Sequence, residues 1–222
     1  MYVCIECGCR AKQLFLKNSS AKQISKCLVC CKKMDRYFEL NGLMKLIDLL
    51  LLKRRIFRHY LFNNKKDFTG GALLMLVVRV LTGPMLRHHD ALRLLLSGEG
   101  LGKAVSVDAI SIVFRDAVES LMETGLLLVL SFTVFHRRAG FIKLSSALLL
   151  SSFYYLFVFI MIMWRYRWEE YLPVIDFLCI ASNSIVVSEM CLVRNETAAG
   201  CLYGCKIATG LLCKRILGSI GL

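Results

Sequence analysis

The chain has 222 residues, of which 57% are hydrophobic, and its mean hydropathy is +0.59. An ordinary soluble domain is about 45–50% apolar. Disordered proteins combine low hydrophobicity with high charge. The composition therefore excludes a disordered chain and argues against a simple soluble enzyme.

The net charge of +13 is concentrated near the N-terminus. Residues 1–67 contain 15 Lys and Arg against 5 Asp and Glu, whereas residues 68–222 contain 14 against 11. A basic N-terminal part thus precedes an apolar, nearly balanced body, which favours an integral membrane protein. No apolar run directly follows a short basic start, so we expect no cleaved secretory signal and a cytosolic N-terminal part.

Two CxxC pairs, Cys4–Cys7 and Cys27–Cys30, lie near the start of the chain with 19 residues between them. This spacing is within the 15–20 residues expected between the halves of a four-cysteine zinc site. In a reducing compartment such pairs are more often metal ligands than disulfides. We expect Cys4, Cys7, Cys27 and Cys30 to hold one structural zinc ion, with no coordination position left for water.

Cys9 and Cys31 are additional thiols that could replace Cys7 or Cys30 as ligands. The alternative for the whole set is a redox-active or disulfide-linked cluster. Because about forty residues bury little apolar surface, metal binding must supply folding energy to a small zinc ribbon over residues 1–42. The aromatic residues that single-strand binders stack on bases are sparse here, so we expect no nucleic-acid partner.

Residues 43–67 form a basic amphipathic segment, with a helix expected over 43–62 because this run contains no Gly or Pro. Its charges are too numerous for a lipid-spanning helix, but they are typical of a helix at the membrane surface. The alternative is a helix packed on the zinc ribbon, and both can hold. The residues expected to contact the membrane surface or a partner are Lys53, Arg54, Arg55, Arg58 and His59.

Residues 68–196 are expected to form a helical membrane domain. Its candidate spans are residues 68–86, 118–135, 141–164 and 172–193. A span needs about 20 mostly apolar residues, and 141–164 meets this requirement most clearly. The positive-inside rule places the turn at Arg137 and Arg138 in the cytosol, so four spans leave both termini cytosolic. The apolar tail, 197–222, is expected to lie at the interface.

Arg79 interrupts the first candidate span. A charged residue within a span is costly and usually faces a cavity, a headgroup or a carboxylate. Arg79 is therefore a candidate lipid or cavity contact, with Asp176 and Glu189 as candidate partners. The alternative is that its side chain extends to the interface, or that the segment does not span.

The cluster His88-His89-Asp90 is the one candidate for acid–base or metal chemistry in the body. No second cluster completes a catalytic site, and no phosphate-binding loop, nucleophile elbow or zinc-protease motif occurs. We therefore expect an interfacial polar cap here and no enzyme. The sequence as a whole predicts a small N-terminal zinc ribbon followed by an α-helical transmembrane bundle of about four spans.

An ordered series of motifs runs through the N-terminal part. Cys4-x-x-Cys7-Gly8 and Cys27-x-x-Cys30 precede Asp35-Arg36-Tyr37-Phe38-Glu39, Ile47-Asp48-Leu49-Leu50-Leu51-Leu52-Lys53 and Arg58-His59-Tyr60-Leu61-Phe62-Asn63. Over about the first 63 residues this order resembles the Arv-one (Arv1) family of endoplasmic-reticulum membrane proteins. The sequence departs from the family pattern at Cys31 and at Phe57, where a tyrosine would be expected, and Cys9 is extra.

The resemblance implies a multi-pass protein of the endoplasmic-reticulum membrane that acts in intracellular lipid homeostasis. The family is associated with sterol transport and distribution, sphingolipid balance and glycosylphosphatidylinositol (GPI) anchor synthesis. Expected partners are membrane lipids, either a sterol or a glycolipid precursor, and a membrane biosynthetic enzyme complex. The alternative is a non-catalytic scaffold or regulatory subunit that binds a glycolipid-biosynthesis enzyme.

Overall fold

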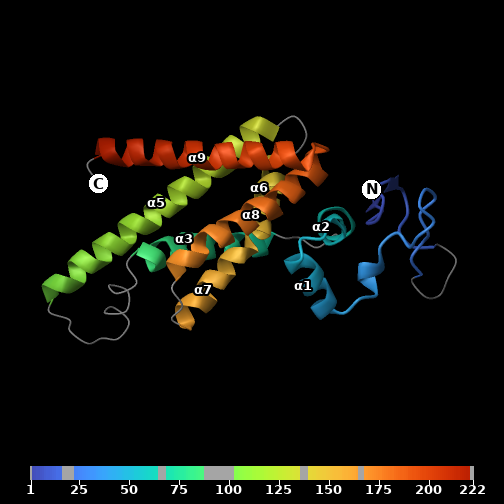
Figure 1. The fold of residues 1–222 in the computed structure, drawn as a ribbon, viewed down its shortest axis with the longest axis horizontal. Coiled ribbons are helices and arrows are strands. Elements are labelled where there is room, and N and C mark those ends of the chain that lie inside the picture. Colours follow the sequence, from blue (N-terminus) through green and yellow to red (C-terminus); the bar gives the residue numbers. More distant parts are fainter. Residues whose placement is uncertain are drawn as a thin grey trace.

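The computed structural model describes residues 2–16, 23–64, 69–87, 103–135, 140–164 and 168–220. The cysteine-rich head lies at one end of the long axis, and the long helices of the body fill the rest (Figure 1). The expected architecture is confirmed, because a cysteine cluster compatible with a zinc ribbon precedes a mostly helical chain with candidate membrane spans.

The head is built on two short antiparallel strands, β1 (Tyr2–Val3) and β2 (Arg10–Ala11), with Val3 opposite Arg10. Isolated bridges between Phe15 and Ile24, and between Lys26 and Lys33, close the second half. Its small buried cluster consists of Cys4, Leu14, Ile24, Cys27 and Met34. Two of the cysteines thus belong to the core of the head itself.

A connecting segment of short helices joins the head to the body. It comprises η1 (Arg36–Phe38), α1 (Gly42–Leu50), α2 (Arg54–Arg58) and a π-helical turn, η2 (His59–Asn63). The single helix expected over 43–62 is broken near Leu52, whose φ is 53°. On the two sides of the break, Leu50 packs against the cluster of Tyr154 and Phe57 packs in a different cluster, with Val186.

The body contains the long helices. They are α3 (Thr69–Arg87), α5 (Lys103–Phe135), α6 (Phe141–Ser151), η3 (Phe153–Tyr155), α7 (Leu156–Met163), α8 (Trp168–Cys191) and α9 (Asn195–Ile220). Within the described residues, three stretches are long and apolar enough to cross a membrane, namely Phe114–Phe135, Phe141–Val158 and Glu170–Cys191. Three of the four expected spans fall on them. The segment expected at 68–86 falls on α3, which is a shorter apolar helix over Thr69–Thr82.

The C-terminal tail forms α9, which packs against α8 and α5 (Figure 1). The Ser184 hydroxyl donates to Asn195 Oδ1 at 3.2 Å, and farther along the pair Lys206 Nζ lies 2.7 Å from Asp176 Oδ1. These two contacts show that α9 runs back along α8. The tail thus packs against two candidate spans, and its place at the membrane interface stays a prediction.

Candidate metal centre and its connection to the body

The two CxxC turns share one backbone pattern. In the first, Cys4 N–H donates to Cys9 O at 2.8 Å, and Gly8 N–H donates to Cys4 O at 2.9 Å. The second repeats it, because Cys27 N–H donates to the carbonyl five residues later and Cys31 N–H donates to Cys27 O. Gly8 and Cys31 hold equivalent positions and have φ of 78° and 57°. Glycine adopts this left-handed conformation freely, whereas Cys31 adopts it under strain.

The sulfur atoms of both turns converge. The Sγ atoms of Cys4, Cys7, Cys9 and Cys27 all lie within 4.8 Å of one another. Cys4 Sγ is 3.7 Å from Cys30 Sγ, Cys7 Sγ is 3.6 Å from Cys27 Sγ, and Cys9 Sγ is 3.0 Å from Cys27 Sγ. With Zn–S bonds of about 2.3 Å, a tetrahedron has sulfur–sulfur edges of about 3.8 Å. The first two distances match such an edge, and the third is too long for a disulfide.

The donor set therefore fits a tetrahedral four-thiolate zinc ion, with five thiols near four positions. Cys30 and Cys9 are the two candidates for the last position, since Cys30 lies at edge distance from Cys4 and Cys9 lies beside Cys27. Cys31 is exposed. A site filled by four sulfurs has no open position for water, so the arrangement is compatible with a structural role.

Backbone N–H groups prepare one of the sulfurs for metal binding. The N–H groups of Cys30 and Val29 point at Cys27 Sγ, the latter at 3.4 Å, and lower the pKa of Cys27 to about 6. Burial raises the pKa of Cys4 to about 12. Because zinc binds thiolates, the lowered pKa of Cys27 favours its ligand form, whereas burial disfavours the ligand form of Cys4.

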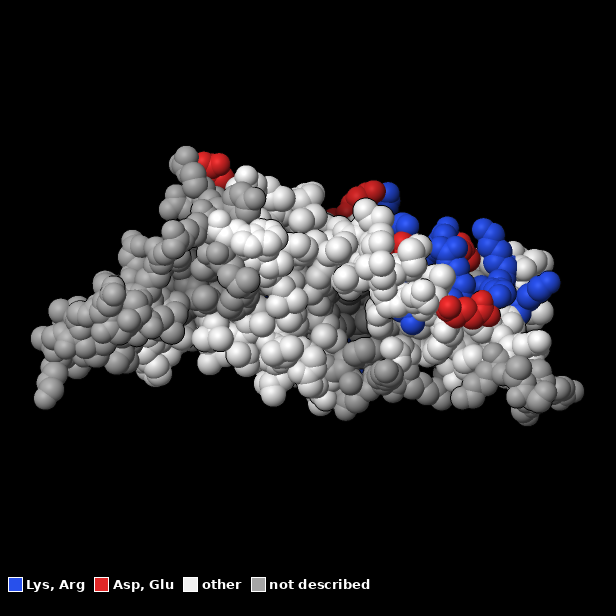
Figure 2. Space-filling model, turned by 90° about the horizontal axis from the view of Figure 1, so that it is seen from below, with Lys and Arg blue, Asp and Glu red and all other residues white. Residues whose placement is uncertain are grey.

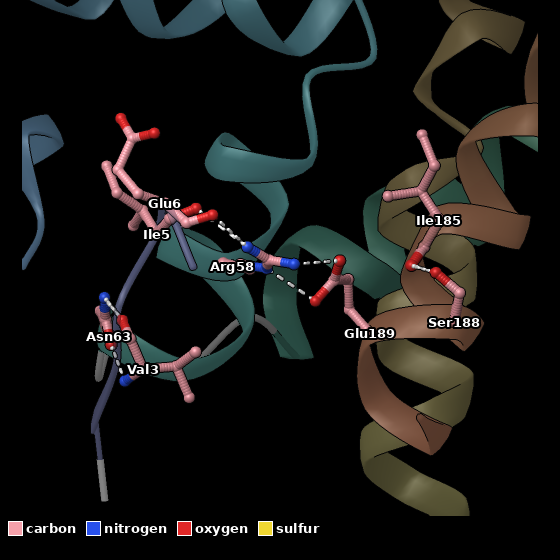
Figure 3. Close-up of polar contacts among 8 residues, drawn as sticks. All are labelled: Val3, Ile5, Glu6, Arg58, Asn63, Ile185, Ser188 and Glu189. Carbon is pink, nitrogen blue, oxygen red and sulfur yellow. Dashed lines mark hydrogen bonds and ion pairs between the residues drawn. The ribbon is translucent and has the colours of Figure 1, made fainter. Parts of the chain in front are cut away.

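A buried polar network fixes the connecting segment against the head. Asp35 is fully buried; it accepts the Tyr37 N–H at 3.0 Å and lies 2.7 Å from both His59 Nδ1 and Asn63 Nδ2. Asn63 also exchanges two hydrogen bonds with the backbone of Val3, at 2.8 and 2.9 Å (Figure 3). Every one of these buried groups has a partner, as a stable polar core requires. In the motif Arg58–Asn63, His59 and Asn63 are thus the two side chains that contact the buried Asp35.

Arg58 connects the first cysteine turn to α8. Its Nη1 donates to the carbonyl oxygens of Ile5 and Glu6 at 3.1 and 3.0 Å, both residues being inside the CxxC turn. Its Nε and Nη2 form a bidentate pair with Glu189 at 2.8 and 3.0 Å (Figure 3). The side chains of Arg58 and Glu189 are only 15% and 10% exposed. A Cβ on Gly8 would lie 3.3 Å from the Arg58 guanidinium carbon, so a side chain there would press on it.

The basic residues expected at the membrane surface form two groups. Lys53 and Arg54 are exposed, and Arg55 is partly exposed beside Glu6. Arg58 and His59 instead point into the protein and are engaged in the contacts above. On the face shown in Figure 2, Lys and Arg gather over the head, whereas the described surface of the body is mostly uncharged.

Arg79 of α3 lines two adjoining crevices, which we call the Arg79 crevice, between α3, α5, α6, α8 and α9. Its guanidinium carbon lies 5.0 Å from the centroid of the Tyr155 ring. The Tyr155 hydroxyl donates to Asp176 Oδ1 at 2.8 Å, and Lys206 Nζ lies 2.7 Å from the same oxygen. Asp176 is thus engaged by Lys206 and Tyr155, and Glu189 is engaged at the head. The cluster at residues 88–90 lies outside the described residues.

Comparison with known proteins supplies the family. The model of the Arv1-like family matches residues 3–187. The chain belongs to the Arv1-like family. The Arabidopsis thaliana protein ARV 2 is 27% identical over 230 residues, which cover 98% of this chain and 96% of that protein. The Arabidopsis protein ARV 1 is 25% identical over 214 residues, covering 92% and 83%.

The human protein ARV1 is 37% identical over 70 residues, which cover 31% of this chain and 26% of that protein. No solved structure matches the chain. The resemblance seen in the N-terminal motifs is thus confirmed for nearly the whole chain. Membership of the Arv1-like family, together with three helices long enough to span, supports a membrane protein of lipid homeostasis.

Proposed function

We propose that this chain acts in the endoplasmic-reticulum membrane, where it carries or distributes sterols, with links to sphingolipid metabolism and GPI anchor synthesis. Membership of the Arv1-like family supports the general role. Arg79 is the observation that carries the proposal of direct lipid contact, because it places a cation among the helices of the membrane domain. Zinc has a structural role in this proposal, and no catalytic step is assigned to the chain.

The connecting segment is proposed to lie on the cytosolic face of the membrane. Leu43, Leu46 and Leu51 are 68%, 50% and 61% exposed, so α1 and its end present an apolar surface. Exposed Lys53 and Arg54 stand next to it. This combination is typical of an interfacial helix, and each basic residue near an anionic surface contributes about 1 kcal/mol. With α3 crossing as the fourth span, both termini are cytosolic in this orientation.

Native mass spectrometry of the gently extracted full chain, with identification of the retained lipid, tests the proposal. We expect one sterol or one glycolipid precursor for each chain. The variant Leu127→Trp places a bulky ring in the crevice and should abolish retention. Leu121→Trp lies on the same helix but is about half exposed, so it serves as the matched control. Equal retention by the two variants would exclude the crevice as the lipid site.

A scaffold that binds a membrane biosynthetic enzyme is the second candidate. The observation that favours it is the tip of the second cysteine turn, where Leu28 and Val29 are strongly exposed. A photo-crosslinker placed at residue 28 of the full chain in its native membrane tests this function. Crosslinks to one biosynthetic subunit, with only bulk phospholipid in the mass spectrum, would favour the scaffold over the carrier.

A further inference from the structure

Ile5, which lies between Cys4 and Cys7 in the first cysteine turn, packs on the body. It is fully buried and belongs to a cluster with Ala147 of α6 and Val186 of α8. The buried cysteines belong to a different cluster, the core of the head. The loop between two expected zinc ligands therefore supplies an apolar contact to the body.

The polar side of the same contact passes through Arg58. Figure 3 shows its guanidinium between two carbonyl oxygens of the first cysteine turn, those of Ile5 and Glu6, and the carboxylate of Glu189. The Glu6 side chain is also engaged, because its Oε2 lies 3.0 Å from Arg55 Nη2. Arg58 can reach both carbonyl oxygens only while the CxxC turn keeps its folded shape.

The shape of this turn depends on the rest of the head. Ile5 N–H donates to Met34 O at 3.0 Å, so the backbone after the second cysteine turn holds the first one in place. The core of the head is small, and Cys4 and Cys27 are two of its five buried residues. Small domains of this kind take much of their folding energy from the bound metal. Loss of zinc would therefore release Ile5 and the two carbonyl oxygens from the body.

We propose that zinc binding by the head and packing of the head on α6 and α8 are energetically linked, with Arg58 and Glu189 as the connecting residues. Such coupling between two sites is reciprocal. Zinc keeps the apolar surface around Ala147 and Val186 covered, and Glu189 raises the zinc affinity although it lies outside the sulfur cluster. A chain that has lost zinc thus exposes a surface of α6 and α8 that the loaded chain conceals. This linkage holds whichever lipid the chain carries.

Competition with a chromophoric chelator measures the zinc affinity of the full chain in lipid nanodiscs. Glu189→Gln should weaken zinc binding about tenfold or more, because the loss of a charged hydrogen bond changes an equilibrium constant by about that factor. Glu196→Gln is the matched control and should bind zinc like the wild type, because Glu196 pairs with Arg194 at the surface and is 82% exposed. Equal zinc affinities of Glu189→Gln and the wild type would overturn the proposal.

Removal of zinc from the wild-type chain tests the linkage from the other side and needs no substitution. Hydroxyl-radical footprinting with and without the chelator compares two neighbouring valines of α8, both of which are fully buried. Val186 lies in the cluster that contains Ile5, whereas Val187 lies in a cluster formed by residues of α5, α6, α8 and α9. We expect labelling of Val186 to rise severalfold when zinc is removed and to fall again when zinc is restored, while labelling of Val187 stays unchanged.

The two valines separate the linkage from a general loss of structure. If Val186 stays protected in the zinc-free chain, the head packs on α8 without its metal and the proposal is overturned. If Val186 and Val187 are labelled together, zinc removal loosens the whole body, so the effect does not belong to this contact and the proposal is again overturned. A rise at Val186 alone, together with weaker zinc binding by Glu189→Gln, supports the linkage.

Discussion

Replacing Glu189 with Gln removes the carboxylate that receives Arg58 and preserves the shape of the side chain. In the folded protein Glu189 accepts two charged hydrogen bonds from Arg58, while Arg58 also donates to two carbonyl oxygens of the first cysteine turn. The amide of Gln can accept one of the two bonds and presents N–H groups to the other. We therefore expect the zinc head to separate from α8 more often in this variant.

The magnitude follows from the geometry and the burial. A hydrogen bond to a charged group contributes about 1.5–3 kcal/mol, and breaking a fully buried ion pair costs about 3–5 kcal/mol. The two side chains retain 15% and 10% exposure, so water partly screens them. We therefore expect Glu189→Gln to weaken the contact between the head and α8 by about 2–3 kcal/mol. This corresponds to an increase of about 30- to 150-fold in the population in which the head is separated from α8.

Hydroxyl-radical footprinting of the full chain in lipid nanodiscs measures this opening. Ile5 of the head is fully buried in one cluster with Ile185 and Val186 of α8, so its protection from labelling should fall by up to that factor in Glu189→Gln. Glu196→Gln is the matched control, because Glu196 pairs with Arg194 at the surface and is 82% exposed. If the two variants lose the same protection, or neither loses any, the contact does not hold the head on α8.

Three further predictions concern the head and the connecting segment. Cys27→Ser should lose the zinc measured by elemental analysis, whereas Cys31→Gly should keep one ion for each chain, because Cys31 is exposed and holds a glycine-like φ; zinc loss in both would contradict this assignment. Gly8→Ala should lower stability by about 1–2 kcal/mol in thermal melting, because its φ is 78° and the new Cβ would press on the guanidinium. Lys53 Nζ lies 2.6 Å from Oδ1 of the buried Asp48, and the Tyr37 hydroxyl donates to its other oxygen. Lys53 and then Tyr37 lower the pKa of Asp48 below its ordinary 3.8, so the stabilisation is present at neutral pH and is lost as the pH falls through the lowered value. Lys53→Met should therefore melt below the wild type at neutral pH, and the gap should close in acid; a gap independent of pH would refute the ion pair.

The features that the sequence predicted depend on residues close together in the chain, namely the cysteine turns and the long apolar helices. The two CxxC pairs fold as two similar turns because each needs only a tight loop and its own backbone hydrogen bonds. The apolar stretches coincide with long helices, because a bilayer-length run of apolar residues satisfies its backbone groups within one helix. Cys9 was expected only as a possible replacement, and its proximity to Cys27 depends on the path of β2.

Contacts between residues far apart in the chain could not be predicted from the sequence. Arg58 and Glu189 are 131 residues apart, and Arg58 shows the same basic pattern as its surface neighbours Arg54 and Arg55. Nothing in spacing or composition distinguishes a guanidinium that faces lipid from one that binds a carboxylate of another helix. The same is true of Asn63, which pairs with a strand 60 residues earlier.

The break at Leu52 and the course of α9 illustrate a second limit. Residues 43–62 favour one helix by composition, but two apolar clusters compete for its leucines and phenylalanine. The glycines and lysines of the tail lower its hydropathy below that of a span. Their positions nevertheless allow α9 to pack on α8 and α5, with Lys206 beside Asp176. The position of α9 therefore follows from its contacts with α8 and α5, which its hydropathy does not reveal.

The pairing of Lys206 with Asp176 sets an order of events during synthesis. The ribosome makes α8 before α9, and chains fold from the N-terminal side as they emerge. Asp176 therefore enters its helical neighbourhood before the lysine that neutralises it has been made. A chain that stops short of α9 leaves Asp176 with its hydrogen bond from Tyr155 but without the cation Lys206, a costly arrangement in lipid. Completion of translation and neutralisation of this acid by Lys206 thus coincide.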